Sequence, residues 1–326
     1  MGQSFAVIGA GAIGAYVGAA LTRGGSTVTL VARGAHLAAM QRDGVRVISG
    51  RGDFTARPRA VGSIAEVGPV DVVILALKAQ QIAAIAPELR ALNHDRTAIV
   101  AMQNGIPWWY FQRHGGPYDG RTIEAVDPGG VLARSIDPAR VIGCVIYSST
   151  EIVEPGVIQH LEGTRYSLGE PDRSVSDRLK AIAADFVAGG LKAPVESDIR
   201  KDIWVKLLGN AAFNPISALT RATLVAMAED PCVHALVAEM MAESIAVAER
   251  LGSPVDIAIE KRIEGARRVG EHKTSMLQDL DARKAFELDA LVGAVVELGA
   301  LVGIPTPATS HVYALAHLLD RTNRAG

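Results

Sequence analysis

The sequence predicts two domains, an α/β domain built on a mostly parallel sheet followed by an all-helical domain. Apolar runs with the length of buried strands recur through the first half of the chain, whereas long helical patterns replace them after Val195. At 326 residues, with 49% apolar side chains, the chain can fill two hydrophobic cores. We place the domain boundary near residue 197, which divides the chain into residues 1–197 and 198–326.

The first domain opens with a strand, a glycine-rich turn and a helix. An apolar run over residues 4–8 leads into G-x-G-x-x-G, and small apolar residues follow it. Such glycines allow a tight turn and let the backbone approach a pyrophosphate, while the helix N-terminus offers free N–H groups and a positive dipole. This context is typical of a Rossmann-type dinucleotide site. The predicted cofactor-binding residues of the turn are Gly9, Ala10, Gly11, Ala12, Ile13 and Gly14.

A second strand is predicted over residues 26–32, and the residue that follows it distinguishes NAD sites from NADP sites. About 20 residues beyond the fingerprint, an NAD site carries Asp or Glu for the ribose. This chain has Arg33 there, and no acidic residue lies between Gly14 and Asp43. Because a guanidinium suits a 2′-phosphate, the sequence favours NADP (NADPH) over NAD and over a flavin.

The remaining strands of this domain are predicted to place polar residues at one edge of the sheet. Lys78 and Asn104 follow buried strands, and ligands of open α/β sheets bind outside the carboxyl ends of the strands. The aromatic run at residues 108–111 is either core or the wall of a substrate pocket. Residues 115–140 are predicted to be loop with one short strand. Strands are expected at residues 71–77, 97–101, 141–147 and 156–160, and a last helix at residues 175–187.

The second predicted domain begins with an apolar helix that carries one polar stripe. Apolar residues are too frequent in residues 202–215 for a surface helix, so we expect burial nearly all round. Lys206, Asn210 and Asn214 are spaced i, i+4, i+8, each displaced about 40° from the one before. Because Asn214 precedes Pro215, its amide is expected near the helix C-terminus. The stripe is either a structural hydrogen-bond network or a ligand site.

Four further helices are predicted, over residues 232–251, 255–270, 276–302 and 308–319. Ser275 has the spacing of an N-cap, with Gln278 reaching back to it. Asp279 and Glu287 are eight residues apart and could face one side of that helix. A carboxylate with apolar neighbours, such as Glu287, often has a cationic partner, although an exposed acid is commoner. The dense charges of residues 260–273 are most simply a solvated helix face.

Charge and composition argue against several other functions. A net charge of −2 gives no general attraction to nucleic acid or to an anionic membrane. Cys144 and Cys232 allow at most one disulfide and no C-x-x-C metal cluster, which fits a reducing cytoplasm. The first 22 residues lack charge, but they contain five glycines and no basic n-region, so we expect no signal peptide or membrane anchor. A small-molecule partner is expected, and a homodimer is left open.

The motifs, taken in order, resemble the ketopantoate reductase family, NADPH-dependent enzymes that reduce 2-dehydropantoate to pantoate on the route to pantothenate. The resemblance spans nearly the whole chain, and its most specific part is K-x-x-x-N-x-x-x-N-P followed by SMLQD. It is carried by GAGAIG at residues 9–14, Arg33, LALKAQQ around Lys78, QNG at residues 103–105, PGVIQH at residues 155–160, IWVKLLGNAAFNP at residues 203–215, TSMLQD at residues 274–279 and Glu287.

The resemblance implies a Rossmann-type domain joined to a helical domain, with the active site in the cleft between them. Lys206 would be the general acid, while Asn210, Asn214 and Ser275 would hold the 2-oxo acid. Apolar surroundings lower the pKa of a lysine, whereas a nearby carboxylate such as Glu287 opposes that shift. We therefore expect Lys206 to be protonated near neutral pH.

The same resemblance implies roles on the cofactor side. Asn104 would lie at the nicotinamide and the substrate, Lys78 at the cofactor edge, and Glu287 close to the nicotinamide and the general acid. The chain departs from the family pattern at residues 108–111 and 115–140. Both departures lie near the substrate side, so they leave the identity of the 2-oxo acid open.

Two other functions compete with this one. Enzymes of the β-hydroxyacid dehydrogenase type also join a Rossmann domain to helices that carry a Lys and an Asn. The second Asn-Pro and the SMLQD run favour the ketopantoate reductase interpretation. A non-catalytic NADPH sensor is the alternative of a different class, and the intact stripe that begins at Lys206 argues against it.

Overall fold

The computed structural model describes residues 2–325 and divides into two compact units. Unit 1 holds the chain up to Gln103, Trp109–Arg121 and Val131–Ile199. Unit 2 holds Asn104–Trp108, Thr122–Gly130 and the chain from Arg200 onward. The two units are therefore not separated at a single point in the sequence, because two short segments of the N-terminal half belong to the helical unit.

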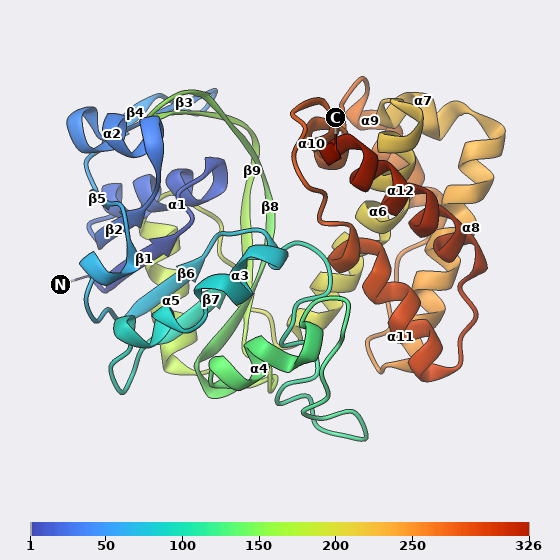
Figure 1. The fold of residues 1–326 in the computed structure, drawn as a ribbon, viewed down its shortest axis with the longest axis horizontal. Coiled ribbons are helices and arrows are strands. Elements are labelled where there is room, and N and C mark those ends of the chain that lie inside the picture. The colour runs from blue at the N-terminus through green and yellow to red at the C-terminus, as the bar shows by residue number, and fades with distance from the viewer. Residues whose placement is uncertain (1, 326) are drawn as a thin grey trace. The chain divides into compact units, whose positions relative to one another are not determined.

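Unit 1 is built on a nine-stranded mixed sheet in the order β4-β3-β9-β8-β7-β6-β1-β2-β5 (Figure 1). The six strands from β5 to β8 in this order are all parallel. They reproduce the 3-2-1-4-5-6 arrangement of dinucleotide-binding folds, so the predicted fold class is confirmed. The strands are β1 Ser4–Ile8, β2 Thr27–Val31, β3 Val45–Ser49, β4 Phe54–Ala56, β5 Arg59–Val61, β6 Val72–Leu75, β7 Ala98–Ala101, β8 Val141–Glu154 and β9 Val157–Gly169.

Helices cover this sheet and bury their small residues against it. The helices of unit 1 are α1 Ala12–Arg23, α2 Gly34–Asp43, α3 Ala79–Ile85, α4 Val131–Ser135 and α5 Asp177–Ala188. Helix α1 packs so closely that a Cβ at Gly18 would overlap the side chain of Leu30 on β2. Helices α1 and α5 share one buried cluster with the sheet, which includes Leu21, Ile182 and Phe186.

The sequence correctly predicted five of the six strands of the parallel part, β1, β2, β6, β7 and β8, but missed the rest of the sheet except β9. The short strands β3, β4 and β5 were not foreseen, and the β8–β9 hairpin is much longer than expected. The extra length of β9 pairs with β3 in parallel, which extends the sheet beyond the dinucleotide-binding core. The strand expected within residues 115–140 is wrong, because the segment contains the short helix α4 instead.

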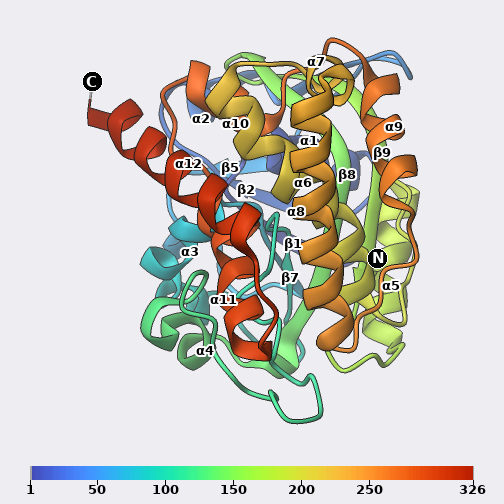
Figure 2. The ribbon, with the colours of Figure 1, turned by 90° about the vertical axis from the view of Figure 1, so that its right-hand side faces the viewer.

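Unit 2 is helical, and Figure 2 shows its long helix α8 with α11 and α12, both of which contact it. The continuous helix expected over residues 276–302 is wrong. It breaks after α10, where Arg283 has φ +53°, and resumes through a π-helical turn at Asp289–Gly293. The helices are α6 Ile199–Thr220, α7 Leu224–Glu229, α8 Pro231–Arg250, α9 Ile259–Val269, α10 Ser275–Asp281, α11 Ala294–Val302 and α12 Pro307–Ala325.

The two segments that come from the N-terminal half are tied to unit 2 by backbone hydrogen bonds. The Ile106 N–H donates to the Ala290 carbonyl at 2.8 Å. The Glu297 carboxylate accepts the N–H groups of Glu124 and Ala125, each at 2.8 Å. The Glu297 carboxylate, which is partly exposed, and a π-helical carbonyl therefore fix the course of these segments.

Helix α8 is long and apolar enough, by length and composition alone, to cross a membrane. Within unit 2, however, it buries Val237, Met240, Met241 and Val247. The core helix of a globular unit meets the same criterion, so this is weak evidence for a membrane span.

The aromatic run that follows Asn104 is buried. Trp108 is 2% exposed and Trp109 is 1% exposed, and Tyr110 and Phe111 are fully buried. A Cβ at Gly143 would lie 2.6 Å from the Trp109 indole, so this glycine makes room for the ring. For Trp109 the structure favours a core role over a pocket wall.

We therefore expect Trp109→Leu to lower the free energy of unfolding by about 2–4 kcal/mol, because a buried ring is replaced by a smaller side chain. Chemical denaturation would measure this, with Leu161→Ala as control, since Leu161 is 46% exposed. A changed ranking of 2-oxo acid substrates at unchanged stability would return Trp109 to the substrate pocket.

Candidate functional site

A cavity of about 820 Å³ opens in unit 1 at the carboxyl ends of β1, β2, β5 and β6. It lies where the strand order reverses between β1 and β6, which is where dinucleotides bind in this fold. Its lining includes the glycine-rich turn, Arg33, His36, Ser63, Gln80 and Gln81. The cavity is therefore lined by four of the ten residues predicted to bind the cofactor, namely Gly9, Ala10, Gly11 and Arg33.

The glycines of the turn fit a pyrophosphate for three different reasons. Gly9 has φ +95°, and a Cβ there would lie 2.6 Å from Leu77 Cδ2. A Cβ at Gly14 would overlap the Gly9 carbonyl, so this glycine lets α1 approach the strand. Gly11 faces open space and forms the N-cap of α1 without a side-chain cap, which leaves the first N–H groups for an anion. Ala12 and Ile13 are the first residues of α1.

Arg33 is exposed, lies two residues after the end of β2, and is the N-cap of α2. Its neighbour His36 was not predicted from the sequence. Burial lowers the pKa of the His36 ring below its usual range, so the ring is neutral at pH 7. Its Nδ1 then accepts the Gly156 N–H at 2.9 Å, which joins α2 to the β8–β9 turn beside the cavity. Lys78 begins α3 and is not among the residues that line this cavity.

In unit 2 the polar stripe lies on α6, whose burial was predicted correctly. Asn214 is 5% exposed, and Lys206 and Asn210 are partly exposed. The expected position of Asn214 at the helix end is wrong, because α6 continues through Pro215 to Thr220. Beyond the proline, Ile216 and other residues are buried, and this packing outweighs the lost hydrogen bond.

Lys206 is held by a short chain of side chains. Its Nζ donates to Asn104 Oδ1 at 2.5 Å, and Asn104 Nδ2 donates to Glu287 Oε2 at 3.2 Å. An ammonium group can only donate and a carboxylate can only accept. The Asn104 amide must therefore present its oxygen to Lys206 and its nitrogen to Glu287, and both hydrogen bonds favour this one orientation of the amide. The structure thus brings together three residues separated by up to 183 positions.

The backbone around Asn104 requires a glycine. Gly105 has φ +82°, and a Cβ there would overlap the Ala290 carbonyl. That carbonyl belongs to the π-helical turn that begins two residues after Glu287. Asn104 and Glu287 are therefore fixed by one close backbone contact. Asp279, which we expected beside Glu287 on a helix, is separated from it by the helix break.

The distal end of the stripe pairs with Ser275. Asn214 Nδ2 donates to Ser275 Oγ at 3.3 Å. The expected capping role of Ser275 is wrong by one residue, because Thr274 is the N-cap of α10 and accepts the Leu277 N–H at 3.3 Å. Gln278 donates instead to the Lys273 carbonyl. Ser275 is thus free of the capping role.

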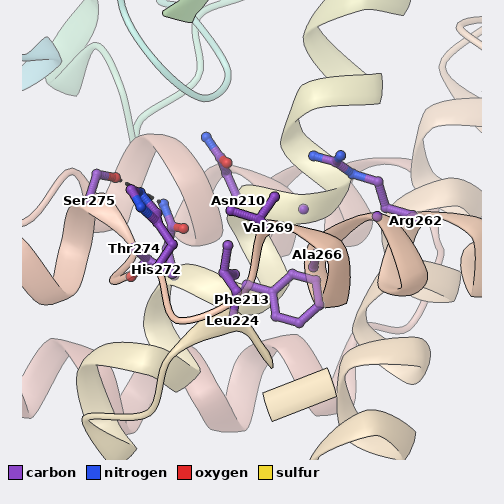
Figure 3. Close-up of a pocket in the computed structure, with 12 residues that line it drawn as sticks. Asn210, Phe213, Leu224, Arg262, Ala266, Val269, His272, Thr274 and Ser275 are labelled. Atoms are coloured by element: carbon purple, nitrogen blue, oxygen red, sulfur yellow. Dashed lines mark hydrogen bonds between the residues drawn. The ribbon is translucent and has the colours of Figure 1, made fainter. Parts of the chain in front are cut away.

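A second cavity, of about 220 Å³, lies beside this stripe in unit 2 (Figure 3). It is lined by Asn210, Asn214 and Ser275, three of the residues predicted to bind the substrate, whereas Asn104 and Lys206 are not among its lining residues. Arg262 and His272 also line it, and the sequence reasoning missed both. Of residues 260–273, Lys261, Arg267 and Arg268 are exposed as expected, but Arg262 is directed to α6.

One feature of the sequence could have indicated the role of Arg262. Gly209 lies inside α6, where glycine is about 1 kcal/mol less favourable than alanine. A Cβ at this position would lie 3.0 Å from Arg262 Cζ. A glycine inside a buried helix is thus a sign that another group approaches its backbone closely.

Comparisons with known proteins identify the family of this chain. Residues 5–108 match the family model of ketopantoate reductase PanE/ApbA, and residues 198–320 match the model of its C-terminal part. A 2-dehydropantoate 2-reductase of Mesorhizobium japonicum is 49% identical over 314 residues, 96% of each chain.

Solved structures of ketopantoate reductases are also similar to this chain. A candidate ketopantoate reductase from Ralstonia solanacearum has a TM-score of 0.93 at 40% identity, with 98% of each chain covered. The 2-dehydropantoate 2-reductase of Methylococcus capsulatus has a TM-score of 0.83 at 30% identity, covering 98% of this chain and 97% of that one. The chain therefore belongs to the ketopantoate reductase family of oxidoreductases.

Proposed function

We propose that this protein is a cytoplasmic enzyme that reduces 2-dehydropantoate to pantoate with NADPH, and that Lys206 is its general acid. The observation that carries the proposal is the 2.5 Å hydrogen bond from Lys206 Nζ to Asn104 Oδ1, with Glu287 on the far side of the same amide. Asn210 follows Lys206 by four residues on α6, so both side chains lie on one face of the helix, and Asn210 lines the cavity of unit 2.

The chemistry of the reaction requires such a group. NADPH, when bound at the glycine-rich turn, supplies the hydride. Hydride addition leaves negative charge on the former carbonyl oxygen, and a protonated lysine can both stabilise that charge and transfer a proton to it. Asn104 orients the ammonium, and Glu287 fixes the orientation of Asn104. Asn210, Asn214 and Ser275 would hold the acid in place.

A direct test is NADPH oxidation over a panel of branched 2-oxo acids and 3-hydroxy acids, with wild type and Lys206→Ala. We expect 2-dehydropantoate to be preferred, and the variant to lose about 10² to 10⁴ in turnover, the usual cost of removing a general acid. Affinity for NADPH should stay near wild type. Lys201→Ala is the control, since Lys201 is exposed at the start of the same helix.

If folded Lys206→Ala turned over substrate at nearly the wild-type rate, the stripe would be a structural network. NADPH binding by wild type without turnover of any acid in the panel would instead indicate a sensor.

The general-acid role also predicts a pH dependence. Because the protonated form of Lys206 is the active one, kcat/KM for reduction should fall as the pH rises through the pKa of this lysine. The measurement is a pH profile of kcat/KM for wild type and Lys206→Ala. The alkaline decline should be absent from the variant, and its persistence there would assign it to another group.

The preference for NADPH is proposed to depend on Arg33. Arg33→Asp should lower the NADPH to NADH ratio of kcat/KM by about 10-fold or more, because charged hydrogen bonds to phosphate are lost and a carboxylate replaces them. Aspartate is a favoured N-cap residue, so the variant should fold. Arg42→Ala, an exposed arginine later in α2, is the control. Equal use of both cofactors by wild type would refute this role.

A further inference from the structure

The cavity beside α6 is polar at both ends and apolar between them. Figure 3 shows Arg262 at one end and Ser275 with His272 at the other, while Phe213, Leu224 and Val269 lie between. Asn210 projects from α6 along one side. At about 220 Å³ the cavity is smaller than those that take drug-sized ligands, so it suits a small molecule. This lining suits a molecule with a polar group at each end and carbon between them.

Arg262 has a defined position at its end of the cavity. It comes from α9, and its guanidinium lies against the α6 backbone at Gly209, where a Cβ would be 3.0 Å from Cζ and from Nε. Glycine is disfavoured inside a helix, so its presence here is explained by the close approach of the arginine. The guanidinium thus contacts α6 at Gly209, which is three residues after Lys206 and directly before Asn210.

The charges that line the cavity indicate which end of the substrate lies beside Arg262. The two basic lining residues are Arg262 and His272, and none of the described residues that line the cavity is acidic. A guanidinium presents paired donors that match the two oxygens of a carboxylate. The carboxylate of a 2-oxo acid is bonded directly to the carbonyl carbon, so it must lie close to the group that protonates the carbonyl oxygen. The end of the cavity nearer Lys206 along α6 is the Arg262 end.

We propose that Arg262 binds the carboxylate of the substrate and that Gly209 makes this possible. The apolar wall formed by Phe213, Leu224 and Val269 then takes a branched carbon, and the Asn214–Ser275 pair takes a neutral polar group at the far end. This assignment rests on the proposed function, and it specifies which end of the substrate enters which end of the cavity.

The test compares two substrates that differ by a single hydroxyl, 2-dehydropantoate and 3,3-dimethyl-2-oxobutanoate. Arg262→Met should raise KM about 10- to 100-fold for both acids alike, the range expected for loss of a charged hydrogen bond, with a smaller change in kcat. Arg262→Lys should recover part of the loss, since it keeps the charge but not the paired donors. Affinity for NADPH should not change.

Gly209→Ala tests the position without removing the charge. The added methyl would displace the guanidinium, so KM should rise for both acids, while the melting temperature should stay equal or increase because alanine is the better helix former. The variant that combines Gly209→Ala with Arg262→Met should have a KM no higher than that of Arg262→Met alone. Arg268→Met is the control on the same helix, because Arg268 is 78% exposed and pairs with Glu264, and its kinetics should match wild type.

Two outcomes would overturn the assignment. If Arg262→Met impaired only 2-dehydropantoate, the guanidinium would contact the hydroxyl rather than the carboxylate. If neither acid were affected, Arg262 would have no role in binding. Calorimetric titration with 2-dehydropantoate in the absence of NADPH separates this result from the proposed function. If 2-dehydropantoate bound in a way that depended on Arg262 but was not turned over, the carboxylate site would be supported and the reductase function refuted. If turnover were unaffected by the Arg262 substitution, the reductase function would be supported and the carboxylate site refuted.

Discussion

The hydrogen bond between Lys206 and Asn104 is the interaction on which the second unit depends. It holds the ammonium group of a lysine on a largely buried helix, where such a group is tolerated only when polar partners surround it. Asn104 provides one partner, and Glu287 determines which way its amide faces. The close contact at Gly105, the break after α10 and the π-helical turn all serve to bring these side chains together.

Much of the fold and part of the site could be predicted from the sequence. Strand-length apolar runs and the glycine-rich turn identified β1, β2, β6 and β7, because parallel strands buried on both faces carry a strong local pattern. The stripe on α6 was recognised from spacing alone, since helical periodicity fixes which side chains share a face. Arg33 was recognised by its distance from the fingerprint, which the fold keeps nearly constant.

The features that were missed depend on contacts between distant residues. The short strands β3 and β5 take their stability from neighbouring strands rather than from their own residues. The break near Arg283 could not be foreseen, because the segment lacks proline and glycine between Ser275 and Leu291. Arg262 was assigned to a solvated surface because its neighbours are charged, although its own position is set by Gly209 on another helix. In each case the deciding partner is far away in sequence.

The insertion of Asn104–Trp108 into unit 2 has a consequence for how the protein is made. Asn104 leaves the ribosome long before Glu287, and the two residues are 183 positions apart. A C-terminal fragment that begins at Arg200 would lack the amide that orients Lys206, so the helical unit is not an independent module. During synthesis, the segment after β7 must wait until nearly the whole chain has emerged before it can dock. Such long-range closure is characteristic of slow folding steps, so we expect the hydrogen bonds that join Lys206, Asn104 and Glu287 to form late in folding.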